Sequence, residues 1–282
     1  MKLLVDSGST KADWIAIDDD GKVLFITQSL GLNPEVLSHD QILDRLNEKF
    51  DISQNKTNVS HIYFYGAGCG TDRMKNYMTD IFKKYFKNAT VLVQEDTFAA
   101  VFATTAKNEK AIVCILGTGS NCSYFDGSVL HQKVQSLGYI AMDDGSGNRF
   151  GRHLLRAYYF NKMDAELAKE LAKEFDLDPD YIKNKLYKEP NPNAYLATFA
   201  KFLIKHKENA YCKKIIKKEL KAFVKNYIMQ FDNYKEVPVH FVGSIAFYLK
   251  DELEAMLLKK GIKLGNVLRR PLDGLIAYHA VD

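Results

Sequence analysis

The stretch that decides the fold spans residues 111–127 and has the sequence AIVCILGTGSNCSYFDG. An apolar run at 111–116 leads into a turn of glycines and hydroxyl residues at 117–120, and a second strand pattern at 121–125 ends in Asp126-Gly127. Asp-Gly between apolar runs is a strong hairpin signal, because both central residues of a type I′ turn have φ > 0. The stretch therefore predicts an antiparallel strand unit whose first turn is rich in glycine.

The same order of elements occurs about a hundred residues earlier in the chain. An apolar strand pattern at 2–6 leads into the small-residue turn SGST at 7–10, and strand patterns at 14–18 and 23–28 flank an Asp-Gly turn. The later copy is completed by a third expected strand at 128–134. Two copies in the same order favour two similar lobes, each led by an antiparallel unit.

Helical and strand patterns alternate between the two copies. Buried strands are expected at 62–65 and 91–94, with helices at 73–86 and 97–105, which implies an α/β fold with parallel strands covered by helices. We expect an N-terminal lobe at 1–107 and a C-terminal lobe at 108–282. The C-terminal lobe then carries a helical insertion at about 151–230, and a last helix at about 271–282 packs back on the N-terminal lobe.

Composition excludes several functional classes. The 282 residues carry 39 Lys+Arg and 35 Asp+Glu, a net charge of +4 that is too weak to indicate nucleic-acid binding. The Lys-rich pattern at 205–228 is interpreted as the solvated face of a helix. No apolar run approaches the ~18 residues of a membrane span, and the charge at Asp6 comes too early for a signal peptide, so we expect a cytoplasmic protein with no membrane partner.

Polar residues at turns and strand ends are the candidates for chemistry. Glycine-rich turns expose backbone N–H groups that bind anions, and two such turns suit a polyphosphate, although one alone is usually a plain hairpin turn. Asp6 ends the first strand, where it either caps a turn or holds Mg²⁺ through water. Asp96 opens a helix, as an N-cap or as a general base. The pair Asp143-Asp144 either lies on a solvated turn or grips sugar hydroxyls.

These turns, in this order, resemble the phosphate-1, phosphate-2 and adenosine motifs of the superfamily of actin, sugar kinases and heat-shock-protein ATPases. The motifs are DSGSTK at 6–11, LGTGSN at 116–121 and VGSIA at 242–246. Within that superfamily the chain resembles the BadF/BadG/BcrA/BcrD-type ATPase family, on its N-acetylglucosamine kinase branch, from end to end. Further matches are GLNP at 31–34, EDTFAA at 95–100, SLGY at 136–139, DDGSG at 143–147 and PLDGL at 271–275.

The resemblance implies two actin-like (ribonuclease H-like) lobes with mixed sheets, flanking helices and an ATP cleft between them. It implies ATP- and Mg²⁺-dependent phosphorylation of N-acetylglucosamine at its 6-hydroxyl, by a homodimer. Asp96 matches the general base and Asp6 the acid near the metal. Sugar contacts match Asn33, Gly119, Gly138, Asp143 and Asp144. Nucleotide contacts match Gly8, Ser9, Thr10, Lys11, Gly117, Thr118, Ser120, Gly243, Ser244 and Ala246. In this scheme the N-terminal lobe binds sugar and phosphate 1, and the C-terminal lobe binds phosphate 2 and adenosine.

The sequence departs from the family pattern near the sugar. Met142 stands where glycine is usual, and Asp144 is a shortened acid. Both departures touch the expected sugar pocket and leave the identity of the sugar open.

Two alternatives remain at this stage. One is an ATPase activator of a CoA-thioester dehydratase, which needs cysteines for an iron–sulfur cluster shared by two subunits. Cys69 is the only loop candidate for such a ligand, because Cys114 and Cys122 lie within apolar strands. The other alternative is a non-catalytic sugar- or nucleotide-binding protein on the same scaffold.

Overall fold

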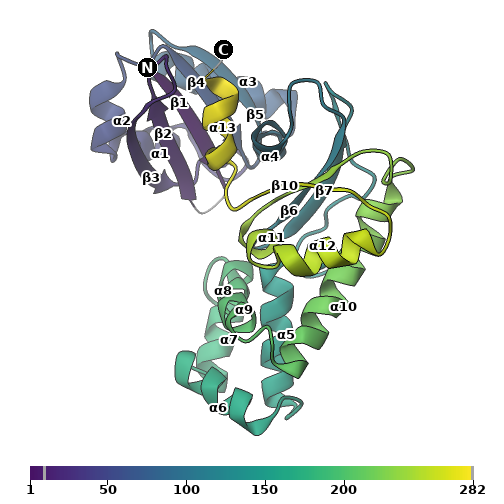
Figure 1. Ribbon diagram of the computed structural model, residues 1–282. Helices are drawn as coiled ribbons and strands as arrows, with labels where there is room; N and C mark the ends of the chain where they lie inside the picture. The colour runs from purple at the N-terminus through teal and green to yellow at the C-terminus, as the bar shows by residue number, and fades with distance from the viewer. Residues whose placement is uncertain (9–10, 281–282) are drawn as a thin grey trace. The chain divides into compact units, whose positions relative to one another are not determined.

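The computed structural model describes residues 1–8 and 11–280, and Figure 1 shows its helices and strands. Ser9 and Thr10, both predicted nucleotide contacts, lie outside the described residues. Contacts divide the chain into two compact units. Unit 1 comprises Met1–Thr104 together with the segment that begins at Arg270, and unit 2 comprises Thr105–Arg269. Among the described residues, no helix combines the length and apolar character needed to cross a membrane.

Unit 1 is a mixed five-stranded sheet with helices on its faces. The strands lie in the order β3-β2-β1-β4-β5. β1 pairs antiparallel with β2 and parallel with β4, and β5 continues the parallel side. The elements are β1 (Lys2–Ser7), β2 (Lys11–Ile17), β3 (Val23–Leu30), α1 (His39–Asn47), α2 (Phe50–Asn55), β4 (His61–Gly66), α3 (Asp72–Tyr85), β5 (Thr90–Glu95), α4 (Asp96–Thr104) and α13 (Leu272–His279).

Alternation along β1 places apolar side chains in two cores of unit 1. Leu3 and Val5 belong to one core cluster, and Leu4 between them belongs to a second cluster that includes Leu272 of α13. Successive side chains of a strand point to opposite faces of the sheet, so one short apolar run supplies both cores. α13 packs closely on α4 because Gly274 has no side chain: an added Cβ would lie 2.1 Å from the carbonyl oxygen of Ala103.

Unit 2 repeats this sheet plan and adds a helical region. Its strands lie in the order β10-β9-β6-β7-β8, again with an antiparallel side and a parallel side. The elements are β6 (Ala111–Leu116), β7 (Ser120–Phe125), β8 (Leu130–His131), α5 (Gly147–Tyr159), α6 (Ala165–Glu174), α7 (Pro179–Tyr187), α8 (Pro192–Thr198), α9 (Ala200–Lys205), α10 (Ala210–Asn226), the 3₁₀ turn η1 (Ile228–Gln230), β9 (Val239–Val242), α11 (Ser244–Tyr248), α12 (Lys250–Leu258) and β10 (Leu264–Leu268).

Three elements of unit 2 differ from the sequence prediction. The strand expected at 128–134 shrinks to Leu130–His131, the two residues that pair with β7. The Lys-rich pattern at 205–228 is divided, because the Asn209 side chain accepts hydrogen bonds from two N–H groups of the next turn and starts α10 as an N-cap. Strand β10 was not predicted.

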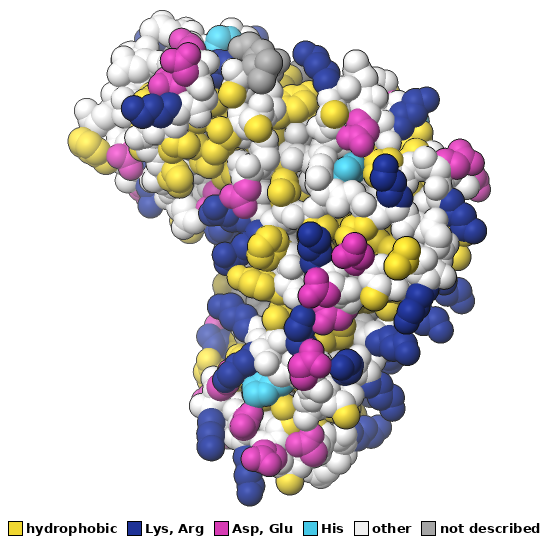
Figure 2. All heavy atoms as spheres, viewed as in Figure 1, with side chains coloured by type: hydrophobic (Ala, Val, Ile, Leu, Met, Phe, Trp, Pro, Cys, Tyr) yellow, Lys and Arg dark blue, Asp and Glu magenta, His cyan; other side chains and the backbone are white. Residues whose placement is uncertain are grey.

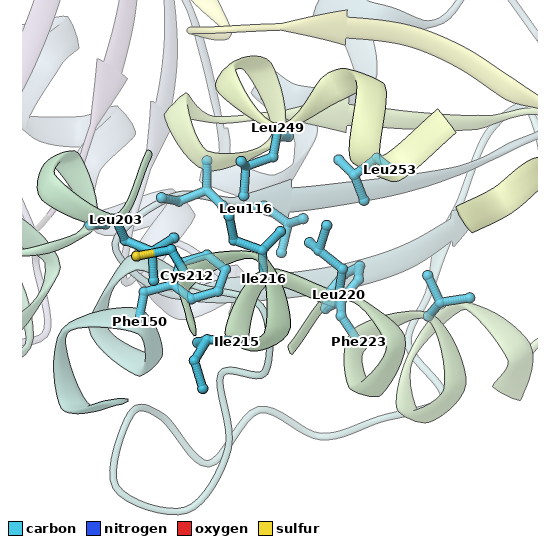
Figure 3. Packing of buried hydrophobic residues seen from close by; sticks show 14 of the residues in the cluster. Leu116, Phe150, Leu203, Cys212, Ile215, Ile216, Leu220, Phe223, Leu249 and Leu253 are labelled. Atoms are coloured by element: carbon cyan, nitrogen blue, oxygen red, sulfur yellow. The ribbon is translucent and has the colours of Figure 1, made fainter. Parts of the chain in front are cut away.

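α10 packs its apolar face under the central strand of the unit 2 sheet. Figure 3 shows Ile216, Leu220 and Phe223 of this helix beside Leu116 of β6. Its lysines are exposed on the opposite side, and Figure 2 shows Lys and Arg side chains gathered over this helix. The Lys-rich pattern is therefore a solvated helix face, as the apolar spacing indicates.

Candidate active site

The carboxyl ends of the parallel strands of unit 1 bring two predicted acids together. Asp6 lies near the end of β1, and Asp96 begins α4 immediately after β5. Burial raises the pKa of Asp6 to about 7, and the carboxylates of Asp96 and Asp13 act in the same direction. Burial also raises the pKa of Asp96, although hydrogen bonds at the start of α4 partly offset this effect. Negative charge thus accumulates at this edge without full compensation.

A close backbone approach places the predicted sugar residue Asn33 beside the loop after β4. Gly68 has φ of +84°, and a Cβ there would lie 2.1 Å from Asn33 Oδ1, so any side chain at this position would displace the amide. Asn33 Oδ1 also accepts a hydrogen bond from Glu35 N at 2.9 Å. The next residue, Cys69, is fully buried, and burial raises the pKa of its thiol to about 12, with Asp96 as the next contributor.

The turn between β1 and β2 resembles the phosphate-1 motif and is called the first phosphate turn. The structure describes Gly8 and Lys11 at its two ends. Gly8 N donates to the carbonyl oxygen of Lys11 at 2.9 Å, which closes the turn between β1 and β2. Lys11 Nζ pairs with Asp13 Oδ2 at 2.8 Å, and its side chain is exposed. The Lys11 ammonium is thus paired with Asp13 close to the acidic edge of unit 1, where it acts to lower the pKa of Asp6.

The turn at 117–120 resembles the phosphate-2 motif and is called the second phosphate turn. Hydrogen bonds within its own backbone and to α5 hold it in place. Gly117 N donates to Gly119 O at 3.0 Å, and Gly147 N donates to Gly117 O at 2.8 Å. Thr118 O accepts from both the backbone and the side-chain amide of Asn148. A Cβ on Gly117 would meet no atom within 4 Å. The turn therefore has a fixed backbone and open space next to Gly117.

That open space is a cavity of about 440 Å³ within unit 2. The second phosphate turn contributes Gly117 and Thr118 to its lining, and the start of α11 contributes Ser244 and Ile245. The other lining residues come from α5, α8 and α9, from the end of α11 and from the residue after β10: Gly147, Ala197, Ala200, Lys201, Ile204, Lys205, Tyr248 and Arg269. The volume lies in the range of small-ligand pockets.

Sequence reasoning missed most of these lining residues. The helical region showed only core periodicity, and nothing in the pattern separates Ala197 or Lys201 from other helix positions. The guanidinium of Arg269 lies 5.6 Å from the ring centre of Tyr248, a cation–π distance.

The stretch at 242–246, which resembles the adenosine motif, has some residues at this cavity and others in the hydrophobic core. A Cβ at Gly243, which has φ of +124°, would lie 2.2 Å from Leu116 O, so the chain reaches the phosphate turn only with glycine here. Ser244 then lines the cavity. Ala246, predicted as a nucleotide contact, is fully buried in the hydrophobic core of unit 2.

Asp143 connects the predicted sugar residues to the second phosphate turn. It is 6% exposed and has φ of +68°. Oδ1 accepts from Ser120 N at 3.3 Å, and Oδ2 accepts from Asn148 Nδ2 at 2.8 Å. A Cβ on Gly119 would approach Oδ2 to 2.9 Å. A carboxylate oxygen can accept two hydrogen bonds, so Asp143 retains the capacity to accept one from a ligand hydroxyl.

The remaining predicted sugar residues have different surroundings. The carboxylate of Asp144 pairs with Arg149 at 3.3 Å and accepts from Asn226 Nδ2 at 2.8 Å, so this acid anchors its own loop. Gly138 has φ of +77°, and a Cβ added there would meet no atom within 4 Å. Met142, the departure from the family pattern, accepts the backbone N–H of Leu137 at its sulfur at 3.3 Å.

Asp6, the predicted metal residue, lies at the acidic edge of unit 1. Within residues 1–8 and 11–280, no group of three His, Cys, Asp or Glu side chains has the geometry of a direct metal site. The raised pKa of Asp6 marks a carboxylate whose charge is poorly compensated, and a hydrated Mg²⁺ would neutralise it. The residues present therefore fit a cation bound through water better than one held by several side chains.

The two mixed sheets with flanking helices have the fold of actin-like sugar kinases. The model of the BadF/BadG/BcrA/BcrD ATPase family matches residues 5–271, and the chain belongs to this family. The predicted α/β class with two actin-like lobes and the predicted family are confirmed.

Solved structures support the same assignment. A proposed N-acetylglucosamine kinase from Porphyromonas gingivalis is 32% identical, with a TM-score of 0.92 over 100% of this chain and 99% of that chain. A proposed N-acetylglucosamine kinase from Chromobacterium violaceum is 15% identical, with a TM-score of 0.69 over 99% and 98% of the two chains. A ROK family glucokinase from Streptomyces griseus, solved with glucose and AMPPNP, shares the fold at 16% identity and a TM-score of 0.57, over 99% and 97%.

Proposed function

We propose that the protein transfers the γ-phosphoryl group of ATP to the 6-hydroxyl of an amino sugar, N-acetylglucosamine. The observation that carries the proposal is the cavity in unit 2, which is lined by both Gly117 and Ser244, two residues far apart in the sequence. Gly117 lies in the stretch that resembles the phosphate-2 motif and Ser244 in the one that resembles the adenosine motif, in a chain that belongs to an ATPase family. The similarity to the proposed kinase from Porphyromonas gingivalis supports the choice of sugar.

The residues of unit 2 bind and orient the nucleotide in this mechanism. Gly117 and Thr118 offer a glycine backbone and a hydroxyl to the phosphates, and Ser244 and Tyr248 line the adenosine side of the cavity. In unit 2, Asp143 and Gly119 hold sugar hydroxyls. In unit 1, Asn33 is the proposed sugar contact. Positioning of this kind supplies most of the catalysis of phosphoryl transfer.

Asp96 of unit 1 is the general base. Its carboxylate accepts the proton of the sugar 6-hydroxyl while the bond from that oxygen to the γ-phosphorus forms, and the bond from phosphorus to the β,γ-bridging oxygen breaks to release ADP. Its raised pKa makes it a better proton acceptor than an ordinary aspartate. Mg²⁺, held through water by Asp6, would neutralise phosphate charge.

A coupled assay of ADP release against a panel of sugars tests the proposal. The panel contains N-acetylglucosamine, glucosamine, N-acetylmannosamine, N-acetylmuramic acid and glucose, and ³¹P NMR locates the phosphate on the product. We expect the largest kcat/KM with N-acetylglucosamine and a 6-phosphate product, with turnover lost in EDTA and restored by Mg²⁺. ADP release that no sugar stimulates would contradict the proposal and favour a binding protein.

Burial of the cysteines weighs against the dehydratase-activator alternative. All four cysteine side chains are buried, and Cys114 lies 3.4 Å from Cys122 between paired strands of the unit 2 sheet. A cluster shared by two subunits needs cysteines at a surface. Iron analysis of anaerobically purified protein separates the two functions, and light scattering tests the homodimer that the family resemblance implies.

A further inference from the structure

The loop at residues 143–145 has a backbone that requires support from outside. Asp143 and Gly145 have φ of +68° and +73°, so two left-handed residues flank Asp144. A non-glycine residue in this region costs about 1–3 kcal/mol and persists only where the surroundings hold it. Besides the side-chain contacts of Asp143 and Asp144 with β7 and α5, this strained loop is supported by one helix, α10.

Each of the three loop residues has its own partner on α10 or at its C-cap. Asp143 N donates to the Tyr227 hydroxyl at 3.2 Å, and Asn226 Nδ2 donates to Asp144 Oδ2 at 2.8 Å. Gly145 N donates to Glu219 Oε2 at 3.3 Å. Consecutive residues of the loop are thus matched by three positions along a single helix.

The helix that carries these partners is itself firmly fixed. Glu219 is 1% exposed, and its carboxylate also binds Arg149 and His153 of α5. Tyr227 is 3% exposed and stacks on Phe223, whose ring belongs to the core under β6 (Figure 3). A Cβ on Gly145 would lie 3.2 Å from Phe223 Cβ, so the loop backbone lies directly on the helix.

We propose that Tyr227, Asn226 and Glu219 are positioning residues for Asp143, so that the helical region of unit 2 sets the geometry of the sugar site. The inference rests on the proposed function, in which Asp143 holds a sugar hydroxyl. Tyr227 has the most direct part, because its hydroxyl binds the backbone N–H of Asp143 itself. The sugar site is then specified by α10, about eighty residues from the motif that carries Asp143.

Kinetics of Tyr227→Phe, Asn226→Ala and the control Tyr211→Phe test this role. Tyr211 lies in the first turn of α10, at the end of the helix away from Asn226. We expect Tyr227→Phe to raise the KM for the sugar about three- to tenfold, as the loss of one hydrogen bond predicts, with the KM for ATP and the melting temperature nearly unchanged. Asn226→Ala should have a smaller effect in the same direction, and Tyr211→Phe should have none.

Hydrogen–deuterium exchange followed by mass spectrometry tests the positioning without any substrate. Peptides that cover residues 141–147 should exchange about two- to tenfold faster in Tyr227→Phe and should be unchanged in Tyr211→Phe. Unchanged exchange, or equal rises in the KM for sugar and for ATP, would overturn the proposal. If no sugar is phosphorylated by the wild type, the proposed function fails, and the exchange experiment still decides whether Tyr227 holds the loop.

Discussion

Each unit holds an acid whose surroundings exclude water and disfavour its charged form, and the neighbours of the two acids act in opposite directions. In unit 1, burial raises the pKa of Asp6 to about 7, and the carboxylates of Asp96 and Asp13 add to the effect. In unit 2, burial acts on Glu219 in the same direction, but the hydrogen bond from His153 and the charges of Arg149 and His153 hold its pKa at about 2. The neighbouring groups, rather than the extent of burial, therefore decide whether the charged carboxylate is disfavoured, as in Asp6, or favoured, as in Glu219.

The difference indicates which carboxylates are able to accept a proton or bind a cation. The carboxylate of Glu219 is occupied by Gly145, Arg149 and His153, so it stabilises a loop. The carboxylates of Asp6 and Asp96 at the edge of unit 1 repel each other, and the hydrogen bonds at the start of α4 offset the burial of Asp96 only in part. Raised carboxylate pKa values of this kind often occur where a proton or a cation is bound. The comparison supports the proposal that Asp96 of unit 1 acts as the proton acceptor, whereas Glu219 of unit 2 holds a loop in place.

The largest expected effect is a loss of kcat on substitution of Asp96 in unit 1, which is compared with a substitution of Glu219 in unit 2. Asp96→Asn removes the proton acceptor, so kcat should fall about 10²- to 10⁴-fold. Sugar binding, measured by calorimetry, should stay within a few-fold of the wild type. The matched variant Glu219→Gln should retain most of its kcat. Equal losses of kcat in both variants would break the comparison.

Stability as a function of pH should change in opposite directions in the two units. The pKa of Glu219 is lowered from 4.5, so its contribution is present above about pH 4.5 and is lost as pH falls toward 2. Glu219→Gln should therefore cost about 1–3 kcal/mol at pH 7 and approach the wild type near pH 2.

Asp6→Asn should instead stabilise the protein at high pH. The pKa of Asp6 is raised from 3.8 to about 7, so its ionisation destabilises the folded state increasingly from pH 4 to 7 and fully above that. Thermal unfolding in EDTA should show a higher melting temperature than wild type at pH 8 and no difference below pH 4. A lower melting temperature at pH 8 would contradict the assignment of uncompensated charge.

Two glycine variants test whether the cavity in unit 2 binds the phosphates of ATP, as proposed. Gly117→Ala adds a methyl group to open space, so the melting temperature should change little while the KM for ATP rises about tenfold or more. Gly243→Ala places its Cβ against Leu116 O in a left-handed conformation and should destabilise the protein by more than about 1 kcal/mol. An unchanged KM for ATP in Gly117→Ala would remove the cavity as the phosphate site.

The smallest effect is expected on the outer face of α10. Lys217→Ala and Lys221→Ala alter exposed side chains and should change the free energy of unfolding by less than about 0.5 kcal/mol. Turnover should be unchanged as well. A large loss of stability or of turnover in either variant would show that these lysines do more than interact with solvent.

The repeat at the start of each unit was predictable because its signals are local. Apolar runs, glycine turns and Asp-Gly pairs report directly on backbone geometry, and both sheets begin with the expected antiparallel strands. The family motifs at 6–11, 116–121 and 242–246 likewise lie at strand ends, as their order predicted. The roles assigned to their residues stay predictions.

The sequence by itself therefore determined the α/β class, the family and the order of strands and motifs, since these depend on residues close together in the chain. Only the tertiary structure placed Ala197, Lys201 and Arg269 at the cavity of unit 2, buried Ala246 in the core and matched Tyr227 to Asp143. The same physical reason explains all of these outcomes. A side chain on a helix has the same periodicity whether it fills a core, lines a cavity or holds a distant loop, and only the packing of remote segments decides which.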